Sequence, residues 1–189
     1  KQPILTEIPD AELDLTQAAL RFIHNRCENL RFNHDDGIDD CKGSSADSNQ
    51  IPYNMQMDVD RLCLEKAVER FMASGVASDA FDIYFCYLEM FVGGYGESRR
   101  MIELLSEFET NASSLLMKHR DHYSHSVYVF VLGLAIFETN QIYRDTYMKF
   151  YSINNDRDAA HHYLKYWGLS SLFHDIGYPF ELPYEQVKS

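Results

Sequence analysis

Two short segments of this 189-residue chain gather side chains that can bind a metal ion. Residues 122–127 read HYSHSV and include His125, and residues 172–177 read LFHDIG and include His174 and Asp175. Imidazole nitrogens and carboxylate oxygens are ligands that divalent transition metals take in proteins. A carboxylate beside an inward-facing histidine is costly to bury unless it is paired, protonated or coordinated. These residue types therefore point to a divalent metal site.

Helical spacing predicts where these side chains point. At 100° per residue, His174 ends a stripe of one helix face and His125 begins a stripe of another. The first stripe contains Ala160, Leu164, Trp167 and Ser171, and the second contains Val129, Leu132 and Ile136. We expect both imidazoles to face the core near a helix end. On spacing alone, two alternatives remain. Each histidine could be a hydrogen-bonded core residue, or the protein could be a plain helical interaction domain in which the motif arises by chance, which would place the rings of His125 and His174 far apart.

Two residues close to His125 are further candidates. His122 lies one turn earlier and is expected at the rim of the pocket, in contact with substrate. Asp121 lies four residues before His125 on the same stripe, so it could orient His125 or act as an additional catalytic carboxylate. The alternative for Asp121 is an exposed acid in a first helical turn. His119 is expected in solvent.

Positive side chains are the expected contacts for a phosphate group. Four of them are candidates, namely Lys118, Arg120, Arg144 and Lys165. The spacing does not single out one of them.

The hydrophobic pattern is helical along most of the chain. Apolar residues recur with helical spacing over residues 10–30, 58–73, 79–91, 97–109, 119–138, 143–151 and 156–173. Residues 82–88 are rich in aromatic side chains and allow a strand as well, although no partner strand is evident. Residues 33–52 are polar and contain several glycines and serines, which is typical of a long mobile loop. The sequence therefore predicts an all-α protein.

Composition excludes several classes of function. The net charge of −12 argues against general nucleic-acid binding, which depends on clustered Lys and Arg. The longest apolar run, residues 127–137, is shorter than the roughly 20 residues of a membrane span. We expect no secretory signal and no disulfides, with Cys63 and Cys86 behaving as small core side chains, and hence a cytoplasmic protein. The initial Lys1 suggests a fragment or a processed start.

The two segments together resemble the HD superfamily of metal-dependent phosphohydrolases. His125-Ser126-x-x-Val129 is followed 49 residues later by His174-Asp175 in the string LFHDIG, and the resemblance covers about residues 117–183. It implies a helical bundle in which His125, His174 and Asp175 are metal ligands. In members with two metals the central aspartate bridges them, and the metal activates water for attack on phosphorus.

The chain departs from this superfamily in three respects, one of which is that residues 177–182 contain neither of the two histidines that often follow the His-Asp pair in nucleotide-cleaving members. The distal ligand aspartate normally follows the His-Asp pair at some distance, and no match to it precedes Ser189. Many nucleotide-cleaving members carry an arginine where this chain has His122. We therefore expect residues 114–189 to be an HD-like core that is cut short at its carboxyl end and belongs to a longer protein. Residues 1–113 would add amino-terminal helices.

The expected function is hydrolysis of a small phosphate ester or nucleotide, with Asp175 and Asp121 as catalytic carboxylates. The cofactor would be a divalent metal such as Mn, Fe, Ni, Zn, Co or Mg. The alternative is a degenerate, non-catalytic HD-like module that binds a ligand or a protein partner. A homodimer is compatible with either function.

Overall fold

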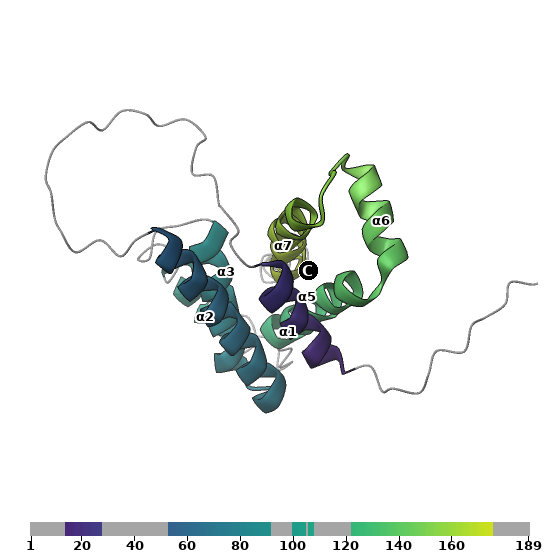
Figure 1. The fold of residues 1–189 in the computed structure, drawn as a ribbon. Helices are drawn as coiled ribbons and strands as arrows, with labels where there is room; N and C mark the ends of the chain where they lie inside the picture. The colour runs from purple at the N-terminus through teal and green to yellow at the C-terminus, as the bar shows by residue number, and fades with distance from the viewer. Residues whose placement is uncertain (1–13, 28–52, 92–99, 105, 108–121, 176–189) are drawn as a thin grey trace, which may run out of the picture.

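A computed structural model describes residues 14–27, 53–91, 100–104, 106–107 and 122–175 of the chain. Within these ranges every regular element is an α-helix, which confirms the all-α class (Figure 1). The helices are α1 (Leu15–Arg26), α2 (Tyr53–Ser74), α3 (Ala77–Phe91), α5 (His122–Thr139), α6 (Gln141–Phe150) and α7 (Asp156–Phe173). Residues 100–104 and 106–107 are also helical. The strand alternative for residues 82–88 is wrong, because they lie inside α3.

Polar side chains and turn residues set several helix ends. The carboxylate of Asp14 caps α1, and the side-chain oxygens of Asn140 and Asn155 cap α6 and α7. α6 ends in a Schellman motif, in which Ile153 N–H donates to Met148 O at 2.9 Å and Ser152 N–H donates to Lys149 O at 3.3 Å. Ser152 occupies the left-handed position of this motif, with a φ of 56°.

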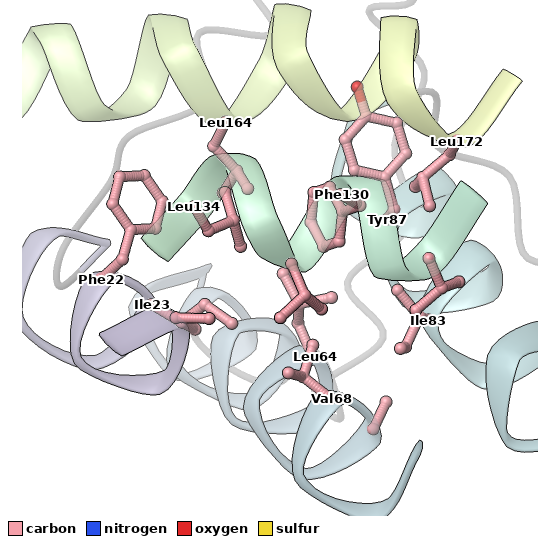
Figure 2. Packing of buried hydrophobic residues seen from close by; sticks show 14 of the residues in the cluster. Phe22, Ile23, Leu64, Val68, Ile83, Tyr87, Phe130, Leu134, Leu164 and Leu172 are labelled. Atoms are coloured by element: carbon pink, nitrogen blue, oxygen red, sulfur yellow. The ribbon is translucent and has the colours of Figure 1, made fainter. Parts of the chain in front are cut away.

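α5 is the central helix of the bundle. It packs against α1, α3, α6 and α7, while α2 packs against α1 and α3. In Figure 1, α2 and α3 lie together on one side and α6 lies on the other, with α1, α5 and α7 between them. Phe130 and Leu134 of α5 are fully buried among core residues of the neighbouring helices (Figure 2). Those neighbours include Phe22, Leu64, Ile83 and Leu164.

A close approach fixes how α5 and α7 lie against each other. The indole of Trp167 covers Gly133 so tightly that a Cβ added there would lie 2.1 Å from the ring. Trp167 Nε1–H donates to Phe130 O at 3.1 Å, and Tyr163 OH donates to Gly133 O at 3.1 Å. Because two side chains of α7 bond to backbone carbonyls of α5, sliding of one helix along the other would break both bonds.

The structure corrects the expected orientation of α5. Leu132 and Ile136 are 46% and 38% exposed, and His125 is exposed as well, so the predicted stripe faces outward instead of toward the core. α5 is apolar around its whole circumference, and its periodicity therefore does not distinguish the buried face. The stripe of α7 is buried as expected at Ala160, Leu164 and Ser171, but it ends in an exposed His174.

Two other expectations concern the cysteines and the polar segment. Cys63 is exposed, so its expected role as a core side chain is wrong, whereas Cys27 is buried and Cys86 half-buried. All three are free thiols. The segment 33–52 lies outside the described residues.

No single helix among the described residues has the length and apolar character of a membrane span. α5 and α6 reach that threshold only as a pair broken by a bend of 96°.

Candidate metal centre

Three predicted ligands come together where α5 begins and α7 ends. Ligand atoms of His125, His174 and Asp175 all lie within 4.8 Å of one another. The two imidazole rings have centroids 5.7 Å apart, so they are not widely separated as a chance motif would require. His125 and His174 are exposed and Asp175 is half-buried, which leaves the group open to solvent on one side.

The antiparallel course of α5 and α7 explains this meeting. His125 lies eight residues before Gly133, and His174 lies seven residues after Trp167. At 1.5 Å per residue, both ligands therefore lie about 10–12 Å from the Gly133–Trp167 contact along the helix axes. Because the helices are antiparallel, both lie on the same side of that contact. The contact in the middle of the two helices thus aligns ligands that are far apart in sequence.

A hydrogen bond determines which nitrogen of His174 is available to a metal. His174 Nδ1 lies 2.7 Å from Ser171 O, and because a carbonyl only accepts, Nδ1 must carry the proton. In the neutral ring, Nε2 then has a free lone pair, and it lies 3.2 Å from Asp175 Oδ1. A metal ion between these two atoms would bind the lone pairs of both.

The spacing of these atoms suits a metal ion. For bonds of about 2.0–2.2 Å, neighbouring ligand atoms on one metal lie about 2.9–3.5 Å apart. The His174 Nε2 to Asp175 Oδ1 distance of 3.2 Å falls in this range. All ligand atoms of the group lie within 4.8 Å of one another, which is less than about 1 Å beyond the separation of two opposite ligands on one metal. The residues present therefore fit a divalent metal.

The last turn of α7 is held by side chains that satisfy its carbonyl groups. The final four carbonyls of a helix have no partner within the helix. Tyr84 OH of α3 donates to Leu172 O at 2.7 Å, and His174 donates to Ser171 O. Tyr84 is also in edge contact with Phe173, at a centroid distance of 5.5 Å. α3 thereby holds the backbone immediately before His174.

His122 contacts the same group from α5. Its Nδ1 lies 3.5 Å from Asp175 Oδ2, the oxygen opposite the one that faces His174. The side chains of His122 and Asp175 are 26% and 15% exposed, so this contact is partly open to solvent. The expected contact of His122 with substrate stays a prediction. Asp121, the additional catalytic candidate, lies outside the described residues, as do His119, Lys118 and Arg120.

The other predicted phosphate contacts are not part of the group. Arg144 is buried and donates to Phe137 O at 2.6 Å and to Glu138 O, so it holds the end of α5. Its expected role as a phosphate contact is wrong. Lys165 lines a separate hollow beside the α6–α7 turn, together with His161 and His162. Burial, followed by the charge of Lys165, lowers the pKa of both of these histidines.

Sequence reasoning missed the residues that position the ligands. Ser171 acts through its backbone carbonyl, which no residue type reveals. Tyr84 lies 88 residues before Leu172 and has no local signal. Gly133 did have one, because a lone glycine within an apolar helix often marks a close approach.

Comparison with known proteins adds no family assignment. No family model matches the chain, and no curated protein or solved structure matches it significantly.

Proposed function

We propose that this chain is a divalent-metal-dependent phosphohydrolase that cleaves a small phosphate ester or a nucleotide with metal-activated water. The observation that carries the proposal is the convergence of His125, His174 and Asp175, with Nε2 of His174 3.2 Å from Oδ1 of the Asp175 carboxylate. The resemblance of residues 117–183 to the HD superfamily supports the same chemistry.

Each residue has a distinct role in this proposal. His125 and His174 supply neutral nitrogen ligands, and Asp175 supplies the negative charge that strengthens binding of a divalent cation. The cation, once bound, supplies an acidified water and neutralises charge on the phosphate. Ser171 O fixes the His174 tautomer, and His122 contacts the oxygen of Asp175 that faces away from His174.

The open side of the group is where a phosphate can approach. His125 and His174 are both exposed, so a substrate could approach a metal held by them without rearrangement of the core. The buried remainder of α5 and α7 keeps the ligands in place while the substrate binds and leaves.

Hydrolysis of p-nitrophenyl phosphate and of a nucleotide panel tests the proposal. Protein would be loaded in turn with Mn²⁺, Fe²⁺, Ni²⁺, Co²⁺, Zn²⁺ and Mg²⁺. We expect turnover with at least one metal, and a loss of at least about 100-fold in kcat/KM for Asp175→Asn, because removing an inner ligand costs more than removing an outer one. Asp145→Asn, at an exposed position of α6, is the matched control and retains activity.

A metal-loaded protein that hydrolyses none of these substrates would refute the catalytic proposal. It would instead favour a module that binds a ligand without reaction.

A further inference from the structure

We propose that the outward face of α5 binds an apolar organic group of the substrate, so that the substrate is a phosphate ester of an apolar alcohol. This inference rests on the proposed function, because it takes the phosphate to lie at His125, His174 and Asp175. The surface is formed by Tyr128, Leu132 and Ile136 and is called the α5 apolar face below.

The α5 apolar face is unusual for a helix surface that contacts water. Tyr128, Leu132 and Ile136 are 43%, 46% and 38% exposed. No Asp, Glu, Lys or Arg occurs between His122 and Phe137, although the whole chain carries a net charge of −12. An outward helix face normally presents charged and polar residues, and a helix that is apolar all round is normally covered.

The face begins at a predicted metal ligand. At 100° per residue, Tyr128, Leu132 and Ile136 all lie within about 60° of the direction of His125. They follow it along the helix axis at about 4.5, 10.5 and 16.5 Å. A molecule whose phosphate lies beside His125 therefore meets the α5 apolar face, which is roughly as long as a chain of ten or more carbon atoms.

Tyr128, the residue of the α5 apolar face nearest to His125, is held in place by contacts with α2. The ring of Tyr128 packs against Phe71 of α2, with centroids 4.9 Å apart. Its hydroxyl lies over Gly75, at the end of α2, so the ring bridges α5 and α2. A fixed aromatic ring one turn from the metal group offers a preformed surface for the first carbon atoms of the alcohol.

The continuity with the metal group favours substrate over a second copy of the chain as the occupant. A substrate would contact the metal group with its phosphate and the α5 apolar face with its organic group. A second copy of the chain on this face would instead lie against the open side of the metal group. In the reaction, water attacks phosphorus and the P–O bond to the alcohol breaks. The alcohol leaves with a proton, and inorganic phosphate is the other product.

Binding of ethylphosphonate and hexylphosphonate to the metal-loaded protein tests the inference by calorimetry. The two probes share one headgroup and are not hydrolysed, so their difference reports the alkyl chain. Full burial of a methylene favours binding about fourfold, and four added methylenes lying on one open face predict roughly tenfold tighter binding of hexylphosphonate. Leu132→Ser is expected to reduce this preference and leave ethylphosphonate binding unchanged.

Ile142→Ser is the matched control, because Ile142 is 79% exposed on α6, away from the α5 apolar face. This substitution should not alter the preference for hexylphosphonate over ethylphosphonate. Metal content is measured in the same samples. If the protein takes up no metal, the proposed function is refuted. If the metal-loaded protein binds both phosphonates equally, only the role of the α5 apolar face in substrate binding is refuted. A dimer that Leu132→Ser converts to monomers in sedimentation would also overturn the inference and assign the face to a second copy.

Discussion

Gly133→Ala tests whether the α5–α7 contact determines the structure of the site. The added Cβ would lie 2.1 Å from two ring atoms of Trp167, whereas ordinary contacts begin at 3.4 Å. The indole must therefore shift by more than 1 Å, which also stretches its hydrogen bond to Phe130 O. Because Trp167 belongs to the helix that carries His174, the shift moves one metal ligand relative to His125.

The expected loss of stability follows from three contributions. Overpacking a filled site costs about 1–3 kcal/mol, and weakening the Trp167 hydrogen bond costs about 0.5–1.5 kcal/mol. Alanine regains about 1 kcal/mol over glycine in a helix interior. Gly133→Ala should therefore lower the free energy of unfolding by about 2 kcal/mol.

Urea unfolding followed by circular dichroism measures this change. Trp167 is the sole tryptophan, so its fluorescence reports its displacement in the folded state as well. Ser170→Ala, at an exposed position of α7, is the control for helix propensity and should not lower stability. A Gly133→Ala protein that is as stable as the parent, with unchanged tryptophan emission, would refute the account of how α5 and α7 are aligned.

Three further predictions concern the ends and surroundings of these helices. Tyr84→Phe leaves the Leu172 carbonyl without its hydrogen-bond donor. This change should lower the free energy of unfolding by about 1–3 kcal/mol and weaken metal affinity in a titration. Unchanged values of both quantities would contradict the role given to Tyr84. Ser152→Gly removes the backbone strain of a non-glycine residue in the left-handed conformation at the end of α6. The free energy of unfolding measured in urea should rise by about 0.5–1 kcal/mol. A decrease would contradict the assignment of a Schellman motif. Burial, then the charge of Lys165, lowers the pKa of His161 in the folded protein, so the unfolded chain binds more protons below about pH 6.5. Stability should therefore fall as pH drops below that value, with a shallower slope in His161→Gln; identical slopes would exclude His161 as a cause.

Much of the helical framework could be predicted because apolar spacing is a local property. The pattern over residues 156–173 coincides with α7, and the break at Gly75 coincides with the end of α2. The motif residues His125, His174 and Asp175 were also predicted as one group, and the structure brings them together.

Orientation and support could not be predicted in the same way. α5 is apolar all round, so its sequence does not indicate that Leu132 faces outward. Arg144 has the side chain of a phosphate contact, yet it binds backbone carbonyls at the end of α5. The support of the ligands by Tyr84 and by the Ser171 carbonyl depends on tertiary contacts that sequence spacing does not encode.

The metal content of the purified protein tests the central claim most directly. The parent, His174→Ala and His162→Ala would each be prepared without chelator, incubated with transition-metal ions, freed of excess ions and assayed by plasma mass spectrometry. His162 is on the same helix but bonds to Tyr147 at 2.7 Å, outside the proposed group. The account predicts near-stoichiometric metal in the parent and in His162→Ala and its loss in His174→Ala. A parent that retains no metal, or a His174→Ala protein that retains as much as the parent, would contradict it.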